Sequence, residues 1–494
     1  MLQVYKKISV ALLLGASSLN AMAGGMFSNN NQNPVFFRQP AQQAVVGIQG
    51  AYYDPAGVAM MNNGWHLGVG DMMAFQTRRV TSEYAPFAMN ASNPGSSVRE
   101  FKGSTFSPLI PSLDLAYVHD RWAASFHFGV VSGGGHCTFD KGLGSFEAPI
   151  ALLPGAVNML TGSQMFSAYE ADIHFTGENF AFGGQLNFAY KIIDTEKHKL
   201  SVSAGVRLNY IQNTYTGGIF DYNLFQGGNK ISAVTALKPV LMGLGLPEAQ
   251  AAAYAAQLGG DKEVDCKQKA WAVNPIISAH YATGAWDFAV KYEFVTKVNL
   301  KNDTRINTAG IAQFNDGAKV AGDMPSILTA GFSVDILKNL RGAAGMNIYF
   351  DKYADYNGRQ EKLGSNTFEF NIGAEYDINP RWTVSLGSQI TRFDFGENND
   401  YLTDMSFSLP SWCLGGGFRY HFTDRIAIDV SAFNTFYEKA SKKYTDYGNA
   451  GATYAGVLSG LGIPQEMISK LYLPGTDEFF RTSFTWGIGL VWDF

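Results

Sequence analysis

The chain ends in the stretch FTWGIGLVWDF (residues 484–494), in which large apolar side chains alternate with small or polar ones. Successive side chains of a β-strand point to opposite faces, so a period of two predicts a strand here. Its apolar face would consist of Phe484, Trp486, Ile488, Leu490, Trp492 and Phe494. The closing strand of a soluble sheet is the alternative interpretation.

The same alternation recurs along the chain, in residues 180–188, 202–210, 382–386 and 426–430. Beyond the N-terminus, no stretch offers the about 18 uninterrupted apolar residues that a membrane-spanning helix needs. Short alternating segments are typical of a membrane barrel, whose strands show an apolar face to lipid and a polar face to the lumen. The final strand also resembles the C-terminal strand that outer-membrane barrels present to their assembly machinery.

Turn-forming residues organise these segments into hairpins. Six short connections are expected, at residues 119–121, 194–197, 283–285, 338–342, 379–381 and 423–425. Seven longer ones lie between them, near residues 76–110, 133–176, 216–268, 299–323, 354–365, 396–408 and 441–479. Thirteen connections imply fourteen strands, and short turns that alternate with long loops are typical of bacterial outer-membrane barrels. We therefore expect an all-β fold, a transmembrane, antiparallel, up-and-down β-barrel of about 14 strands.

The part of the chain before the first strand divides into two segments. A basic start, a short apolar run and the small-residue site Ala21-Met22-Ala23 predict a signal peptide over residues 1–23. The barrel is expected over residues 64–494. A ring of fourteen strands is wider than side chains alone fill. We therefore expect residues 24–63 to form a plug, or hatch, inside a barrel of the bacterial outer membrane.

Composition argues against several functions. Without residues 1–23 the chain has 35 basic and 42 acidic residues, a net charge of −7, so nucleic acid is not an expected partner. The eight histidines are not spaced to join a nucleophile or to bind a metal. We therefore expect no enzyme activity, no metal and no cofactor. No obligate protein partner is evident.

The chain has three cysteines, Cys137, Cys266 and Cys413. An odd number does not predict a complete disulfide framework. Cys137 and Cys266 fall in segments that we expect to be external loops, so one bridge between them is an open alternative. Cys413 lies within a strand pattern and is expected to fill space.

The segment before the first strand contains Asp54-Pro55-Ala56. With this motif behind a signal peptide and a plug-length segment, the chain resembles the FadL/TodX-type outer-membrane transporters of long-chain fatty acids and other hydrophobic compounds. The hatch of that family carries Asn-Pro-Ala, and Asp54 stands in the place of the Asn. The resemblance covers the mature chain in architecture, and residue-level matching is confined to the hatch and the C-terminal strand. The alternative is a simple turn, because Asp accepts N–H bonds and Pro fixes φ.

Two outer loops contain related apolar segments, VLMGLGLPE (residues 240–248) and VLSGLGIPQ (residues 457–465). Each leads into an expected helix, over residues 248–258 and 465–471, because Pro is favourable at a helix start. A third apolar stretch covers residues 148–160. Exposed apolar patches mark contact or binding surfaces, and the resemblance implies a groove that captures the ligand first. Packing of the loop helices against each other is the alternative. The groove residues would be Leu241, Leu244, Leu246, Leu458, Leu461 and Ile463.

Alternation points three basic side chains into the lumen, those of Arg207, Lys291 and Arg419. A fatty acid brings a carboxylate, which is costly to bury without a partner. We expect one or more of the three to bind that carboxylate. The alternative is that they pair with inward acidic side chains, namely Glu293, Glu369, Glu375 or Asp429.

The resemblance implies passive, ligand-gated diffusion, in which the hatch shifts and the ligand leaves through a gap at a distorted strand three. That strand is expected over residues 122–131 and runs into Gly133, Gly134 and Gly135, which weaken strand pairing. A simple start of a loop is the alternative. A general porin and a structural or adhesive barrel are the rival functions, and the apolar loop segments favour the transporter. The sequence predicts a hydrophobic ligand but does not identify which one. We expect outer-membrane lipid to surround the barrel wall.

Overall fold

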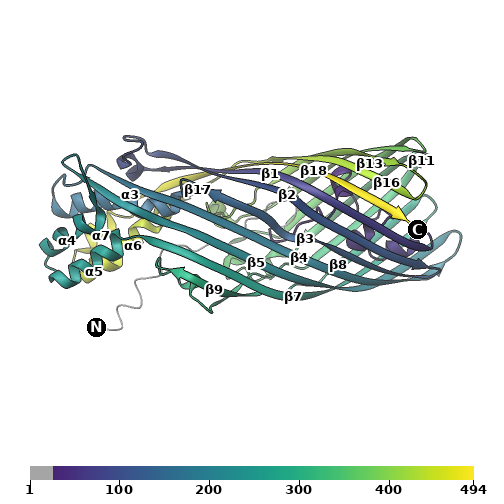
Figure 1. Cartoon of the computed structure of the whole chain (residues 1–494), viewed down its shortest axis with the longest axis horizontal. Coiled ribbons are helices and arrows are strands. Elements are labelled where there is room, and N and C mark those ends of the chain that lie inside the picture. Colours follow the sequence, from purple (N-terminus) through teal and green to yellow (C-terminus); the bar gives the residue numbers. More distant parts are fainter. Residues whose placement is uncertain (1–25) are drawn as a thin grey trace.

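The chain is described from a computed structural model, which places residues 26–494. The expected signal peptide, residues 1–23, lies outside the described residues. The chain forms a closed antiparallel β-barrel of 14 strands, which confirms the predicted fold (Figure 1). The ring closes between β1 (Gly64–Tyr84) and β18 (Gly475–Asp493), which pair from His66 opposite Asp493 to Tyr84 opposite Gly475.

Most wall strands are continuous. Besides β1 and β18 these are β2 (Val98–His119), β3 (Trp122–Phe139), β4 (Ala168–Asp194), β5 (His198–Gln226), β7 (Lys262–Thr283), β12 (Leu340–Tyr349), β13 (Thr367–Asn379), β14 (Trp382–Arg392) and β15 (Ser411–His421). Three further wall strands each consist of two segments, which are β8 (Trp286–Glu293) with β9 (Asn299–Asn307), β10 (Lys319–Ala321) with β11 (Ile327–Leu337), and β16 (Ile426–Tyr437) with β17 (Ala440–Tyr444). The short β6 (Asn229–Ser232) pairs with β5 and belongs to a loop.

The six short turns lie where the sequence predicts them, between β2 and β3, β4 and β5, β7 and β8, β11 and β12, β13 and β14, and β15 and β16. Five of the seven long connections are shorter than predicted, and the first, for example, covers residues 85–97 rather than 76–110. The other two, at residues 350–366 and 393–410, are longer than predicted. A membrane crossing takes about 9–11 residues of a tilted strand, but β5 has 29 residues. The wall therefore continues beyond the lipid, where the outer face is no longer apolar and the alternation that marks a strand fades.

Large apolar side chains are exposed in a belt around the outside of the ring. Among them are Phe75, Leu186, Val206, Trp271, Ile372, Leu386 and Leu490. On a closed barrel such a belt faces lipid. The chain is therefore an outer-membrane β-barrel. Among residues 26–494, no helix has the length and apolar character needed to cross a membrane.

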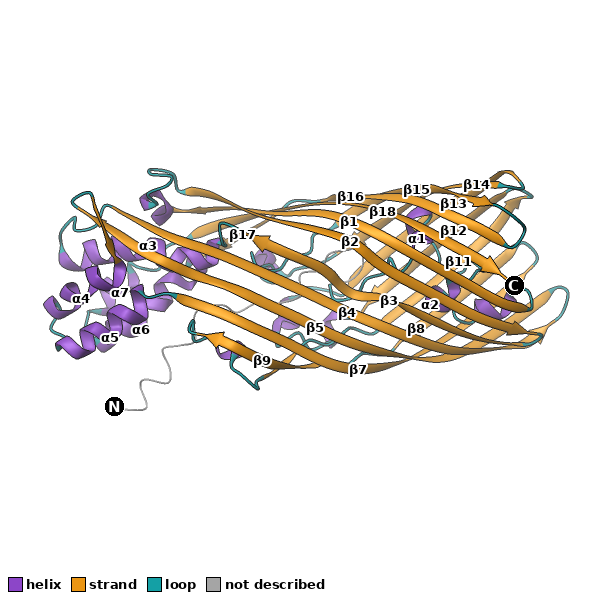
Figure 2. Ribbon diagram, in the orientation of Figure 1, coloured by secondary structure: helices purple, strands orange, loops and turns teal. Residues whose placement is uncertain are grey.

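Five α-helices gather at the end of the barrel opposite the C-terminus (Figures 1 and 2). They are α3 (Gly144–Thr161), α4 (Ala233–Gly243), α5 (Glu248–Gly259), α6 (Ala450–Gly460) and α7 (Gln465–Ser469). The two helices expected behind the apolar segments correspond to α5 and α7. The apolar segments themselves, expected as turns, form the ends of α4 and α6 and the turns that follow them. Burial of one face of each helix in a shared core explains this difference.

Shorter helical turns punctuate the hatch and the loops. They are η1 (Gly57–Met60), η2 (Ala85–Met89), η3 (Ala312–Phe314), η4 (Asp351–Tyr353), η5 (Arg359–Lys362), η6 (Glu397–Asn399) and η7 (Tyr447–Asn449).

The segment before β1 lies inside the ring (Figure 2). It contains α1 (Pro34–Arg38) and α2 (Gly50–Tyr53), all of whose residues are buried. Inward glycines of the wall make room for it. A Cβ on Gly70 would lie 2.5 Å from Cδ of Pro34, and a Cβ on Gly387 would lie 2.5 Å from Cδ of Pro40. The described part of the expected hatch is therefore a plug that the wall is shaped to hold.

All three cysteines are free and buried. Cys137 lies in β3 and Cys266 in β7, not in external loops, and no bridge joins them. The loop assignment was wrong because both strands extend far beyond the membrane. Cys413 lies in β15 and contacts Thr435, in keeping with a space-filling role.

Candidate hydrophobic route through the barrel

The outer helices line a small apolar cleft between α3, α4, α5 and α6. Its lining includes three of the predicted groove residues, Leu241, Leu244 and Leu458. The other three, Leu246, Leu461 and Ile463, pack partly buried against the same hydrophobic core. The loop helices therefore pack against each other and still leave an apolar space. Ligand capture by these residues stays a prediction.

Side chains from other loops fix the first turn of α3. Asp404, from the loop before β15, accepts hydrogen bonds from the backbone N–H of Ser145 at 2.8 Å and from its hydroxyl at 3.0 Å. Glu147 accepts hydrogen bonds from Tyr169 and Asn90. Burial raises the pKa of both carboxyl groups. The helix is thus held rigidly over the barrel mouth.

A second small apolar cavity lies under α3 between β4, β5 and β7. Its lining is largely aromatic and aliphatic, and includes Phe146, Phe175, Ile219, Val264, Phe314 and Met405. Phe146 from α3 lines this cavity while Leu153 of the same helix lines the outer cleft. The helix therefore separates two apolar compartments.

A third cavity, which we call the lumen cavity, has a volume of about 80 Å³ and lies inside the ring. It is lined by Phe27 from the hatch, Ser132 from β3, and side chains of β4, β5, β7, β9 and β10. Its apolar lining includes Ile211, Leu300, Val320 and Met324, and its polar lining includes Asn179, Asn213 and Gln268. The lumen cavity thus reaches β3 at the segment that the sequence singled out.

The wall is interrupted beside the lumen cavity. β2 and β3 pair at Ser104 opposite Thr138 and again at Leu113 opposite Phe128, and residues 105–112 and 129–137 between these points do not pair with each other. The unpaired part of β2 contains Pro108 and Pro111, and a proline has no N–H to donate to a neighbouring strand. This signal is present in the sequence and was missed because Pro108 falls within residues 76–110, which were assigned to a loop, and Pro111 directly follows them.

The distortion of β3 accompanies this interruption. Its pairing with β4 leaves out Val131 and Gly134, so the strand bulges twice within five residues. Gly133 has a φ of +67°, a backbone conformation that glycine adopts most readily. On the outside of the gap, Phe106 and Leu109 are exposed at 56% and 68%. An apolar molecule in the gap would therefore meet apolar side chains on its way to lipid.

The hatch binds the backbone that β2 leaves free. Asn29 donates from its backbone N–H to the carbonyl of Val131 at 2.7 Å and from its side chain to the carbonyls of Val130 and Gly133. Gln32 also donates to the carbonyl of Val130, at 3.0 Å. On the side that faces β2, the distorted segment of β3 is thus held by the plug instead of by the strand.

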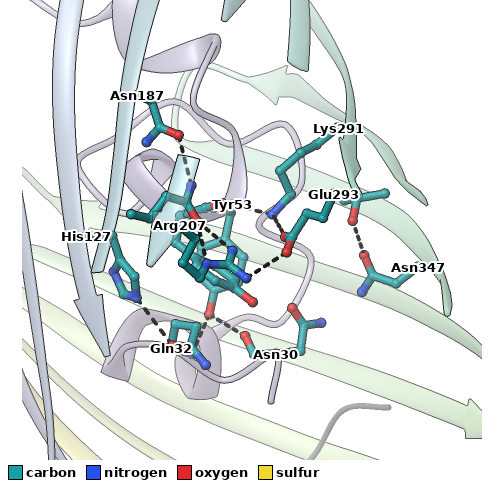
Figure 3. A network of polar contacts seen from close by, with 12 residues as sticks. Asn30, Gln32, Tyr53, His127, Asn187, Arg207, Lys291, Glu293 and Asn347 are labelled. Carbon is teal, nitrogen blue, oxygen red and sulfur yellow. Dashed lines mark hydrogen bonds and ion pairs between the residues drawn. The ribbon is translucent and has the colours of Figure 1, made fainter. Parts of the chain in front are cut away.

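The three predicted cations point inward and already have acidic partners. Arg207 binds Glu293 at 2.7 Å, and Lys291 binds Glu293 at 2.8 Å and the carbonyl of Tyr52 at 2.9 Å (Figure 3). Arg419 binds Asp429 at 2.8 Å. These are the ion pairs that the sequence left as an alternative, and a carboxylate ligand would have to displace them. The carboxylate role of the three residues stays a prediction.

The hatch motif is anchored to β5 and β7 of the wall. Asp54 contacts Nδ1 of His280 at 2.6 Å, and Nε2 of the same ring contacts Asp287 at 2.9 Å. Ala56 donates its N–H to Ser278 and accepts a hydrogen bond from Ser201. Asp54 also accepts the N–H of Gly57, three residues on, so the motif contains a local turn as well as contacts to the wall.

Below the plug lies a polar vestibule of about 610 Å³. Arg38 of α1 crosses from the plug to two wall strands, with Nη2 2.7 Å from Glu375 and Nε 3.3 Å from Asp429. Arg341 and Arg419 also line this space. The axial way out of the barrel is therefore blocked by the plug and surrounded by charges.

Comparison with solved structures finds the same architecture. A FadL homologue of Pseudomonas aeruginosa matches with a TM-score of 0.59 and 12% identity, over 95% of this chain and 100% of that one. The toluene transporter TodX of Pseudomonas putida matches with a TM-score of 0.55 and 13% identity, over 95% and 100%. The toluene transporter TbuX of Ralstonia pickettii matches with a TM-score of 0.51 and 14% identity, over 94% and 98%. No family model and no curated protein matches the sequence. The chain therefore has the fold of the FadL- and TodX-type outer-membrane proteins, as the sequence predicted.

Proposed function

We propose that this protein carries hydrophobic small molecules across the outer membrane by passive diffusion through a plugged barrel. The observation that supports this most is the interruption between β2 and β3 beside the lumen cavity. Two further apolar cavities lie between this cavity and the outside, in the helix cleft and under α3. A molecule that prefers apolar surroundings would find them at each stage of this path.

Energetics favour a lateral exit over an axial one. Transfer from water to an apolar site gains about 0.8 kcal/mol per methylene. That gain would be lost again if the cargo crossed the charged vestibule around Arg38 and Glu375. Release into lipid through the gap keeps the cargo in apolar surroundings, so we infer that Gly133, Gly134 and Gly135 belong to a lateral gate.

Gating would work through the hatch. Asn29 and Gln32 donate hydrogen bonds to carbonyls of β3 that do not pair with β2, and Phe27, close to them in the sequence, lines the lumen cavity. We infer that a ligand in this cavity displaces the start of the hatch, which releases β3, while Asp54, Pro55 and Ala56 anchor the rest of the plug to the wall. The helix-cleft leucines would supply the first binding step.

The class of cargo follows from these cavities only as far as hydrophobic molecules. Long-chain fatty acids fit the proposal, and so do aromatic hydrocarbons, since two structures with this fold are named toluene transporters. A general porin is the main alternative. The buried plug speaks against it, because it occupies the axis that a hydrophilic solute would use.

Uptake by intact cells tests the function. Cells that lack their own hydrophobic transporters would produce this chain, and their uptake of labelled oleate and toluene would be compared with that of a small hydrophilic antibiotic. We expect faster uptake of at least one hydrophobic probe and unchanged antibiotic entry. Unchanged uptake of both hydrophobic probes, with the barrel present in the outer membrane, would refute the proposal.

Removal of the bulges tests the lateral exit. Deletion of Val131 and Gly134 removes the two residues that the register with β4 leaves over, so β3 can run straight. We expect uptake to fall to background while ligand binding at the outer helices persists. As a control, deletion of Gly227 and Gly228, both in the tight turn between β5 and β6, leaves β3 untouched. Normal uptake by the β3 deletion would contradict a lateral exit.

A further inference from the structure

One buried carboxylate inside the ring has no basic partner. Glu369 of β13 is fully buried, and no Lys, Arg or His side chain of residues 26–494 lies within ion-pair distance of it. We propose that Glu369 binds a monovalent metal cation, such as Na⁺, together with the side-chain oxygens of Asn371 and Gln389, and that this cation tightens the hold on the start of the hatch. Glu369 lines none of the three cavities of the proposed route, so the inference goes beyond the proposed function.

The other acidic side chains that the sequence places in the lumen are neutralised. Glu293, Glu375 and Asp429 lie 2.7 Å, 2.7 Å and 2.8 Å from an arginine nitrogen. A buried carboxylate without a counter-charge is costly, and a bound cation would remove that cost. Glu369 is therefore the member of this set that needs a charge from outside the chain.

The two oxygens of Glu369 differ in their contacts. Its Oε1 accepts hydrogen bonds from the side-chain amides of Asn30 at 2.5 Å and Asn347 at 2.7 Å. Its Oε2 is buried and has no hydrogen-bond donor among the described residues. One oxygen thus positions the carboxylate, and the other is left to bind an ion.

Two further amides beside Glu369 offer oxygens of their own. Asn371 follows two residues along β13, on the same face of the strand, and Gln389 of β14 stands opposite Asn371 in the register. Their side chains are buried, and within residues 26–494 neither amide makes a hydrogen bond through its oxygen or its nitrogen. Opposite residues of neighbouring strands have Cβ atoms about 4.5–5.5 Å apart, so the three side chains can bring their oxygens to one ion.

These ligands select the kind of ion. Carboxylate and amide oxygens bind hard cations rather than soft transition metals. The three side chains carry one negative charge between them, which a monovalent cation neutralises. A divalent cation would leave a positive charge uncompensated in a buried place, which is costly.

The carboxylate of Glu369 is also a link to the hatch. Asn30, which donates to it, directly follows Asn29, which donates to carbonyls of β3. The backbone carbonyl of Asn30 accepts a hydrogen bond from the hydroxyl of Tyr53 at 2.7 Å. The start of the hatch is therefore held between β3 and β13. A cation at Oε2 keeps the carboxylate ionised, and hydrogen bonds to an ionised acceptor are about twice as strong as those between neutral groups.

Binding of Na⁺ to the purified full chain in detergent tests the site. Labelled Na⁺ is titrated at about pH 8, well above the ordinary pKa of a glutamate, so that protons compete little for the carboxylate. Hydrogen exchange of residues 26–33 is measured in parallel, in the chloride salts of Na⁺ and of N-methylglucamine at equal ionic strength.

The variants separate the charge from the amide oxygen. Glu369→Gln removes the charge, and Gln389→Met keeps the charge but removes one oxygen ligand. Glu438→Gln is the matched control, because it also removes one carboxylate, but an exposed one that pairs with Arg392.

We expect the wild-type chain to bind one Na⁺ and its hatch to exchange more slowly in Na⁺ than in N-methylglucamine. Glu369→Gln should weaken Na⁺ binding about 10- to 100-fold, the range for loss of a contact to a charged group, and should remove the effect of Na⁺ on exchange. Gln389→Met should weaken binding to a smaller extent, and Glu438→Gln should change neither measurement.

Absence of Na⁺ binding by the wild-type chain would overturn the cation site. Unchanged binding by Glu369→Gln or, if that variant does not fold, by Gln389→Met would overturn it as well. Equal exchange of residues 26–33 in the two salts, with Na⁺ bound, would overturn the link to the hatch.

Discussion

Arg38 forms a buried charged link between the plug and two strands of the wall. Its side chain is 3% exposed, and it bridges Glu375 of β13 and Asp429 of β16. Replacement by Met keeps much of the apolar stem and removes the guanidinium. Both carboxylates would lose a partner inside the barrel, and the plug would lose its bond to two strands at once.

The free-energy cost of Arg38→Met depends on the partners that Glu375 and Asp429 keep. Removal of one partner of a buried ion pair costs about 3–5 kcal/mol. Asp429 keeps Arg419 at 2.8 Å, and Glu375 keeps Arg341 at 3.5 Å, so neither carboxylate is left alone. We therefore expect the lower end, about 3 kcal/mol, which raises the population with a displaced plug about 100-fold.

Thiol labelling measures that population. Ala41 is 1% exposed inside the plug, so Ala41→Cys should react with a maleimide only when the plug moves. We expect Arg38→Met to speed this labelling about 100-fold. Arg392→Met, which breaks an exposed pair, should change it by less than about fivefold, because exposed pairs contribute about 0–1 kcal/mol. Equal labelling rates for Arg38→Met and wild type would refute the assignment of Arg38 as a plug anchor.

Three further predictions concern the plug, the helix cleft and a loop. Gly387→Ala should loosen the plug by about 1–3 kcal/mol in the same labelling assay, since its Cβ would overlap Pro40, whereas Gly416→Ala, whose Cβ meets nothing closer than 3.4 Å, should not. Leu244→Ala should weaken binding of a hydrophobic ligand at the outer helices about 5- to 30-fold, because each lost methylene contact costs about 0.8 kcal/mol. Titration with the ligand measures this loss of affinity. Burial raises the pKa of Asp351 to about 6, so the folded loop keeps a proton that the unfolded loop loses above about pH 4. Protection of residues 350–366 from hydrogen exchange, corrected for intrinsic rates, should therefore fall as pH rises from 4 to 6, and Asp351→Asn should abolish that dependence.

The barrel was predictable because lipid imposes a strict rule on the wall. Every crossing segment needs an apolar residue at every second position, and short periplasmic turns need turn-forming residues. The sequence therefore predicted the final strand and the turn at residues 195–197 correctly. Where the wall rises above the membrane the rule lapses, and the outer parts of β4 and β5 were taken for loops.

The site was only partly predictable because it depends on which side chains meet across the lumen. Alternation placed Arg207 and Lys291 inside, but the sequence could not tell that Glu293, on the same strand as Lys291, pairs with both. The gap in the wall leaves a signal in the sequence, because the part of β2 that pairs with β1 but not with β3 contains two prolines.

The route itself is tested most directly by a crystal structure of the chain soaked with a fatty acid that carries bromine at the end of its chain. The anomalous signal of bromine locates the cargo without reference to protein side chains. We expect peaks in the cleft between the outer helices and in the lumen cavity beside Ser132, on the outer side of the plug. Bromine in the charged vestibule beneath Arg38, with none in the lumen cavity, would show an axial path and contradict the account.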